Sequence, residues 1–155
     1  MKIRLIPVVM LSLLCFPALA QSSKAEYFSN KDLQSQLADL GVKAKAAGSS
    51  GSTLGDYGSH ALKLSVRTTS GGAEVHAHFD DVIVVTQGQA TLITGGTVVD
   101  PKTDKDGETK GASIRNGKSQ IISTGGIVHV PAGTPHQMII APGTLFSAFV
   151  VKVKE

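Results

Sequence analysis

Short β-rich segments separated by glycine-containing turns limit what this chain can fold into more than any other feature. The segments are residues 60–68, 73–78, 82–86, 90–94, 97–100, 120–123, 127–130, 137–140 and 145–153. Turn signals separate them, at Ser70-Gly71-Gly72, Gly95-Gly96, Asn116-Gly117, Gly125-Gly126 and Pro142-Gly143. Segments of this length and spacing are typical of an antiparallel sandwich or barrel, and not of alternating strands and helices. The sequence therefore predicts an all-β fold.

The last segment alternates between apolar and charged residues. Phe149, Val151 and Val153 share one parity, whereas Lys152 and Lys154 share the other. Successive side chains of a strand point to opposite faces. We therefore expect the apolar parity to face the core and the lysines to face solvent.

One helix is expected before the β-rich region, over residues 29–47. Its apolar positions repeat at i, i+4 and i+7, at Leu33, Leu37 and Leu40. Ser29 and Asp32 are spaced like a capping pair at its start. The stretch 48–52 that follows is rich in glycine and serine and is interpreted as a flexible connector. Residues 21–57 would then form the helix and connector, and residues 58–155 the β domain.

The first twenty residues have the pattern of a secretion signal. Lys2 and Arg4 precede an apolar run over 5–14, and Ala18-Leu19-Ala20 supplies small residues for cleavage. The run is shorter than the roughly 20 residues that cross a bilayer. We expect a secreted or periplasmic protein that has no membrane attachment after the signal is removed.

Removal of this signal also changes the charge and the cysteine content. The formal charge falls from +3 to +1 with the loss of Lys2 and Arg4, and Cys15 is lost as well. Nucleic acid is therefore not an expected partner, and no disulfide or cysteine nucleophile is available. The sequence also lacks a Gly-x-Ser-x-Gly motif and a phosphate-binding loop between a strand and a helix.

Three histidines and one aspartate are the candidate metal ligands. His76 and His78 lie two residues apart on an expected strand, so both imidazoles would face one side. Asp81 follows shortly after, and His136 would come from a distant strand. Imidazole and carboxylate together are a ligand set that divalent transition metals accept.

From about His60 to Val153 the chain resembles a single-domain cupin. The second cupin motif is matched by Gly125, Pro131, Gly133 and His136 at the family spacing, although Ile140 stands where the family usually has Asn. The resemblance implies an antiparallel double-stranded β-helix, that is, a jelly-roll or cupin barrel, here with a short N-terminal helix. It also implies a homodimer.

The first cupin motif is matched in two alternative registers. One takes His76 and His78 as the paired histidines, with Asp81 six residues before Gly88, but then the gap between His78 and Asp81 is short. The other takes Glu74 and His76, which restores the gap and puts a carboxylate in place of the first histidine. The first register gives His76, His78, Asp81 and His136 as ligands, with Glu74 as a substitute ligand or a catalytic base.

The resemblance and the ligand set lead to three functional hypotheses. The first is a metal-dependent oxygenase, isomerase or lyase that acts on a small organic molecule, with one divalent ion of manganese, iron, nickel or zinc. The second is a non-catalytic module that binds a sugar or another small ligand, and the third is a structural or metal-storage role. Asp80 and Arg67 are expected to be solvated charges, although an inward-facing Arg67 would be able to bind an anionic substrate.

Overall fold

A computed structural model describes residues 24–155 of the chain, so the expected signal segment 1–20 lies outside the described residues. The helix is α1 (Asn30–Ala47). The strands are β1 (Ser49–Asp56), β2 (His60–Arg67), β3 (Ala73–His76), β4 (Phe79–Gln87), β5 (Gln89–Thr94), β6 (Thr97–Val99), β7 (Lys102–Thr103), β8 (Glu108–Gly111), β9 (Ser113–Arg115), β10 (Lys118–Ser123), β11 (Ile127–Val130), β12 (His136–Ile139) and β13 (Phe146–Lys154).

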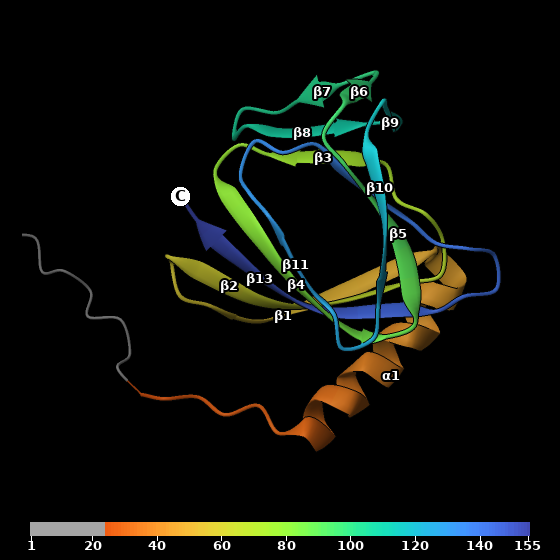
Figure 1. The fold of residues 1–155 in the computed structure, drawn as a ribbon. Helices are drawn as coiled ribbons and strands as arrows, with labels where there is room; N and C mark the ends of the chain where they lie inside the picture. The colour runs from red at the N-terminus through yellow and green to blue at the C-terminus, as the bar shows by residue number, and fades with distance from the viewer. Residues whose placement is uncertain (1–23) are drawn as a thin grey trace, which may run out of the picture.

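The strands form two facing antiparallel sheets, as Figure 1 shows. The first sheet has the order β1-β2-β13-β4-β11, and the second has the order β10-β5-β12-β3-β8-β7. A small third sheet pairs β6 with β9 beside β7 and β8. The expected all-β barrel with one short helix is confirmed.

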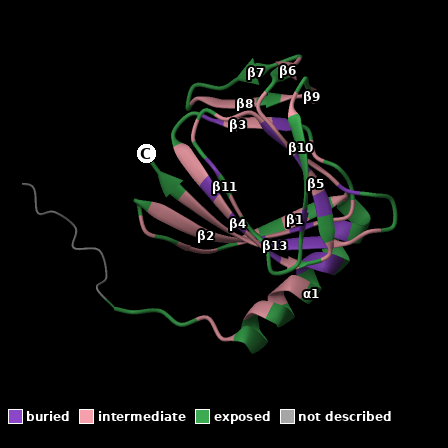
Figure 2. Ribbon diagram, in the orientation of Figure 1, coloured by how far each residue is buried: buried purple, intermediate pink, exposed green. Residues whose placement is uncertain are grey.

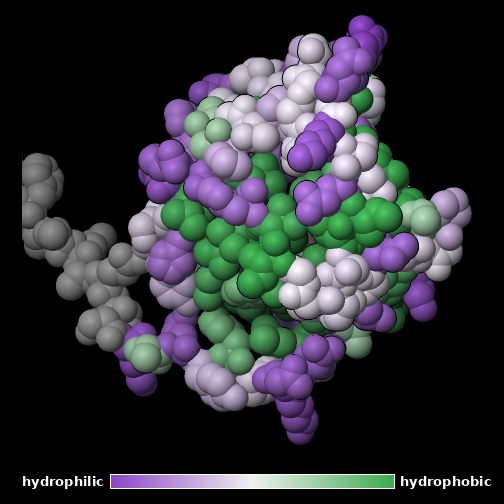
Figure 3. All heavy atoms as spheres, in the orientation of Figure 1, coloured by the Kyte–Doolittle hydropathy of each residue, from purple (hydrophilic) through white to green (hydrophobic). Residues whose placement is uncertain are grey.

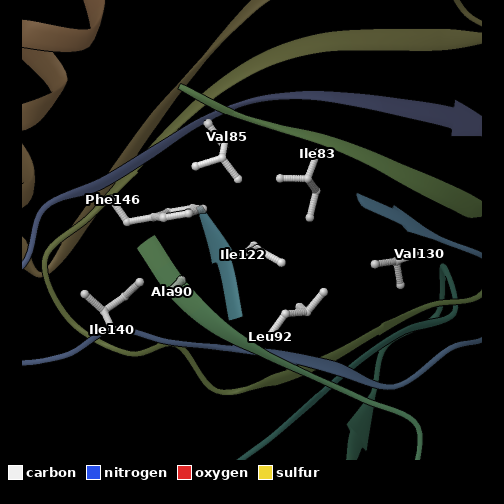
Figure 4. Close-up of a cluster of buried hydrophobic side chains, with 9 residues drawn as sticks. Ile83, Val85, Ala90, Leu92, Ile122, Val130, Ile140 and Phe146 are labelled. Carbon is white, nitrogen blue, oxygen red and sulfur yellow. The ribbon is translucent and has the colours of Figure 1, made fainter. Parts of the chain in front are cut away.

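The main core fills the space between the sheets at one end of the barrel. Figure 4 shows apolar side chains from β4, β5, β10, β11 and β13 pointing toward one another. The buried members of this cluster are Ile83, Val85, Ala90, Leu92, Ile122, Val130, Ile140, Phe146 and Ala148. The polar cavity described below lies in the same interior, beside this core.

A second core lies between α1 and the outer face of the first sheet, below the barrel in Figure 1. Leu40 and Ala44 of the helix pack there against Leu64 and Val66 of β2. The helix begins as expected, because Ser29 Oγ accepts a hydrogen bond from the Asp32 N–H at 3.2 Å. Even-numbered residues of β2 therefore face the helix, which leaves the odd-numbered ones facing the barrel interior.

Two segments differ from the sequence-based expectations. Residues 49–56 are not a flexible connector but the edge strand β1, paired with β2 over most of its length. Ser50 Oγ also donates to the Leu40 carbonyl at 2.6 Å, which ties the strand to α1. Backbone pairing, to which glycine and serine contribute as well as any residue, decides the structure here. The strands β7, β8 and β9 were also not expected, because their sequences show no apolar alternation.

The inward face of β13 is the opposite of the one expected. Ala148, Val150 and Lys152 line the barrel interior, whereas Phe149 packs outward against α1. The strand is buried at its start and exposed at its end, as Figure 2 shows. Its interior-facing positions are not uniformly apolar, because Lys152 lines a polar part of the cavity. Lys152 is therefore a cavity residue and not a solvated one.

None of the helices in residues 24–155 is long and apolar enough to span a bilayer.

Candidate metal centre

Three strands bring the candidate ligands together. His136 is the first residue of β12 and lies directly opposite Glu74 on β3, while His76 is the last residue of β3. Asp81 comes from β4, in the facing sheet. The site thus spans both sheets.

The buried members of this group are His76, Asp81 and His136, which are 8%, 6% and 7% exposed. Asp81 Oδ2 lies 3.3 Å from His76 Nε2 and 3.8 Å from His136 Nε2. The two imidazole rings are inclined at 55° with centroids 5.0 Å apart. Both Nε2 atoms therefore approach the same carboxylate oxygen.

Glu74 completes the cluster from a more exposed position. Its Oε2 lies 4.0 Å from His76 Nε2, and one ligand atom each from Glu74, His76 and His136 lies within 4.8 Å of the others. These separations are at or slightly above those of donor atoms around one ion, since neighbouring ligands of a metal stand about 3–4 Å apart when each bond is near 2.1 Å.

His78 does not join the cluster. β3 ends at His76, and Ala77 and His78 form an exposed bend before β4. The period-two alternation that would bring His78 to the same face therefore stops one residue before it. Its ring lies instead beside Gly107, in the turn between β7 and β8. Of the two registers considered for the first motif, the structure brings together the residues of the one with Glu74 and His76.

A second set of contacts orients the imidazoles. His76 Nδ1 is hydrogen-bonded to Glu108 Oε2 from the neighbouring strand β8, where the two residues face each other. His136 Nδ1 lies 3.1 Å from the Thr134 carbonyl, to which it would donate a hydrogen bond. With both Nδ1 atoms engaged, the Nε2 atoms are directed at the cluster, as in known carboxylate–histidine–metal arrangements.

Lys152 holds the other oxygen of Asp81. Its Nζ donates to Asp81 Oδ1 at 2.6 Å, across the pairing of β13 with β4. Asp81 is thus fixed between an ammonium group on one oxygen and the two imidazoles on the other. The sequence analysis did not identify Lys152 and Glu108, and no motif includes either residue. Both reach the site only because their strands pair with the strands that carry Asp81 and His76.

The pKa directions follow from these contacts. Burial opposes the protonated form of His76, but Asp81 and Glu108 outweigh it and raise the pKa of His76. Burial likewise opposes ionisation of Asp81, yet His76 and Lys152 lower the pKa of that carboxyl. Burial dominates at His136 and lowers its pKa, so this imidazole is kept neutral and able to donate a lone pair.

The turn before β12 is anchored to the site by Asp80. Its Oδ1 accepts a hydrogen bond from the Ala132 N–H at 2.7 Å, and its Oδ2 lies 2.8 Å from His129 Nε2. Gly133, in the left-handed region with φ 73°, donates its N–H to the His76 carbonyl at 2.8 Å. Asp80, expected to be solvated, therefore helps to set the position at which His136 enters the barrel.

The cluster opens into a cavity of about 420 Å³ between the sheets. Its apolar wall includes Ile83, Met138, Phe146 and Val150. Its polar wall includes the four clustered residues together with Glu108 and the cations Lys63, Arg67, Lys110 and Lys152. A cavity of this size accepts a small organic molecule.

The donor set fits a divalent transition metal ion. His76 Nε2 is buried and makes no hydrogen bond of acceptable geometry with any residue in 24–155, although Asp81 Oδ2 is 3.3 Å away. Buried nitrogens are rarely left in this state. Two imidazole nitrogens with one or two carboxylates are ligands that manganese, iron, nickel and zinc all accept. A metal ion at this point would satisfy His76 Nε2.

No protein-family model and no curated relative of similar sequence matches the chain. Solved structures do match. The cupin domain of Cnp3 from Schizosaccharomyces pombe is 10% identical with a TM-score of 0.52, over 69% of this chain and 65% of that one. A Klebsiella pneumoniae protein with a double-stranded β-helix domain is 16% identical with a TM-score of 0.51, over 68% and 76%.

The polyketide cyclase RemF from Streptomyces resistomycificus is 19% identical with a TM-score of 0.50, over 70% of this chain and 66% of that one. The matched part spans just under two thirds of the yeast and Streptomyces chains. Identities this low bear on the fold alone. The chain has a cupin fold. The architecture that the second motif implied is confirmed, and the cupin barrel is the scaffold on which the cluster is built.

Proposed function

We propose that this cupin is a metal-dependent enzyme that acts on a small organic molecule in the barrel cavity. The observation that carries the proposal is the convergence of Glu74 and two oriented imidazoles on one point of that cavity, with Asp81 beside both imidazoles. The reaction would be of the oxygenase, isomerase or lyase type. RemF, named as a polyketide cyclase, indicates that this scaffold can carry chemistry on an organic substrate.

His76, His136 and Asp81 would hold the ion, with Glu74 as a further ligand or as a base. When bound, a divalent ion would polarise a carbonyl or hydroxyl oxygen of the substrate, or activate dioxygen if it is iron. Glu74 is the most exposed carboxylate of the cluster, with 36% of its side chain accessible. It is therefore the group best able to take a proton from a substrate in the cavity.

The remaining residues keep the geometry fixed and line the cavity. Glu108 and the Thr134 carbonyl hold the imidazole tautomers, and Lys152 prevents Asp81 from rotating. Ile83 and Val150 form an apolar wall of the same cavity. Electrostatic effects are larger in such a site than in water.

Metal content tests the proposal. The purified protein should hold about one divalent ion per chain, and His136→Ala should lose it. His78→Ala is the matched control, because this second histidine lies outside the cluster and should leave the metal content unchanged. Absence of metal from the wild-type protein, even after anaerobic loading with several divalent ions, would contradict the proposal.

A metal-free binding barrel is the alternative, and the ion pair between Lys152 and Asp81 favours it. An ammonium group 2.6 Å from a candidate ligand lowers the attraction of that carboxylate for a cation. Metal content separates the two alternatives, because a metal-free binding module would hold no metal. Such a module would also retain its ligand in the His136→Ala variant.

We also propose that the protein works outside the cytoplasm. The proposal rests on the pattern of residues 1–20, in which basic residues are followed by an apolar run and then by small residues. N-terminal sequencing of the protein made in a bacterial host should give Gln21 as the first residue in the periplasm or medium. A product that retains Met1 in the cytoplasm would contradict this location.

A further inference from the structure

The cavity carries cations at a distance from the candidate metal ligands. Lys63 and Arg67 lie on β2, where the odd-numbered residues face the barrel interior. In the register of β2 with β13, Lys63 stands opposite Val150 and Arg67 opposite Phe146. Lys152 lies beyond both, at the level of Ala61. Along the strands, Arg67 therefore lies furthest from the Lys152–Asp81 pair, and Lys63 lies between them.

The guanidinium of Arg67 lies against the loop that leads from β2 to β3. A Cβ placed on Gly71 would lie only 2.7 Å from its Nη1, so the group rests against the Gly71 backbone. Gly71 in turn is held by Met138, whose carbonyl accepts its N–H at 3.0 Å. Gly71 precedes Glu74 by three residues, which is roughly 10 Å of extended backbone. Arg67 therefore stands at about the length of one small molecule from the cluster.

Lys63 and Arg67 have no anionic partner among the described residues. Within residues 24–155, no carboxylate lies at ion-pair distance from Lys63 or Arg67, whereas Asp81 pairs with Lys152 and Glu108 with His76. Four cations and three carboxylates line the cavity, and a divalent ion would add two more positive charges. Partly buried positive charge of this kind favours an anionic ligand.

We infer that the ligand of the cavity is an organic acid, whose carboxylate is bound by Arg67 with support from Lys63. Guanidinium binds a carboxylate through two parallel hydrogen bonds. A second polar group of the ligand, at about the distance of a benzene ring from the carboxylate, meets the Glu74–His76–His136 cluster. The inference deepens the proposed function and rests on it for this second contact, but not for the carboxylate site.

Paired acid and amide probes test the carboxylate site. Binding of 4-hydroxybenzoate and of uncharged 4-hydroxybenzamide is measured by calorimetry, with the full chain both stripped by a chelator and loaded with zinc. The wild-type protein should bind the acid about tenfold or more tightly than the amide in both states. Arg67→Leu should abolish this preference, and Arg115→Leu, at an exposed arginine on β9, should retain it.

Gly71→Ala is a second variant that leaves Arg67 in place. The added methyl group meets Nη1 and displaces the guanidinium, so it should weaken acid binding about tenfold while metal content stays unchanged. Circular dichroism and metal content confirm that each variant is folded.

The outcomes separate the two proposals. Equal binding of acid and amide, no binding of either, or an acid preference that survives in Arg67→Leu would overturn the organic-acid inference, even if the metal is held. A preference seen only in the zinc-loaded state and independent of Arg67 would do the same, because the carboxylate would then bind the metal. An Arg67-dependent preference in a protein that holds no metal would support the inference and contradict the metal-dependent function.

Discussion

Asp81 contacts both the imidazoles and Lys152. One of its carboxylate oxygens lies near the imidazoles, and the other accepts a hydrogen bond from Lys152. Lys152→Met keeps the length of the side chain and removes the ammonium group. We expect the free energy of unfolding of the chelator-treated protein to fall by about 1–3 kcal/mol, since Asp81 loses a charged partner at a site where only 8% of its side chain is exposed.

Urea denaturation checks this expectation, with Lys154→Met as the control. Lys154 is exposed at the end of the same strand and makes no side-chain ion pair with the described residues. Equal stability of Lys152→Met and Lys154→Met would show that the pair contributes nothing.

Asp80 should make the stability of the fold depend on pH. His129, followed by the Ala132 N–H, lowers the pKa of this carboxyl. A carboxyl with a lowered folded-state pKa stabilises the fold above the ordinary pKa of about 3.9. This contribution is lost as the pH falls from there through the lowered value.

Asp80→Asn should therefore reduce stability at pH 7 and converge with the wild type in strong acid. Thermal unfolding at a series of pH values measures the difference, and Asp39→Asn, at an exposed helix position, serves as the control. A destabilisation that is constant across pH would mean that the contacts of Asp80 do not depend on its charge.

At the scale of elements, α1 stabilises the barrel from outside through a small apolar contact. Leu40 is 6% exposed and packs on β2, whereas Val42 on the same helix is 70% exposed. Leu40→Ala should lower the free energy of unfolding by about 2–5 kcal/mol because it opens a cavity in this contact. Val42→Ala should change stability by less than about 0.5 kcal/mol. Chemical denaturation of both variants checks the difference, and similar losses would mean that the helix is not docked as described.

The helix and its cap could be predicted because their determinants are local. Leu33, Leu37 and Leu40 repeat at helical spacing, and Ser29 meets Asp32 within one turn. Strand β1 could not be predicted in the same way, since a Gly- and Ser-rich segment becomes a strand only when β2 is available to pair with it. Strand β8 was missed for the same reason, and with it Glu108.

At the scale of the whole molecule, a homodimer stays a prediction. Ile121 and Ile127 are 68% and 71% exposed, on the edge strands β10 and β11. Figure 3 shows hydrophobic residues gathered across the middle of the face on which these strands lie. Exposed apolar residues on unpaired strand edges are typical of contact surfaces between subunits.

The double variant Ile121→Lys with Ile127→Lys should convert the dimer to a monomer. Light scattering after size-exclusion chromatography measures the mass, and Val42→Lys, at an exposed position of α1, should leave the dimer intact. A monomeric wild-type protein would contradict the prediction at the outset.

The sequence by itself determined the β-rich architecture, the capped helix and the second motif that places His136. These features depend on local periodicity, on turns and on contacts a few residues apart. His76, Asp81 and Glu74 were identified as candidates in the same way, although two registers were left open.

Only the tertiary structure decided which of these candidates meet. β3 ends at His76, so His78 leaves the site, and Glu74 faces His136 through a pairing between strands that lie far apart in the chain. Lys152 and Arg67 were interpreted as surface charges, because the alternation of apolar and charged residues along one strand does not predict a cavity. The site depends on the register between strands and on the way in which the two sheets face each other. Neither feature can be predicted from the residues of a single short segment.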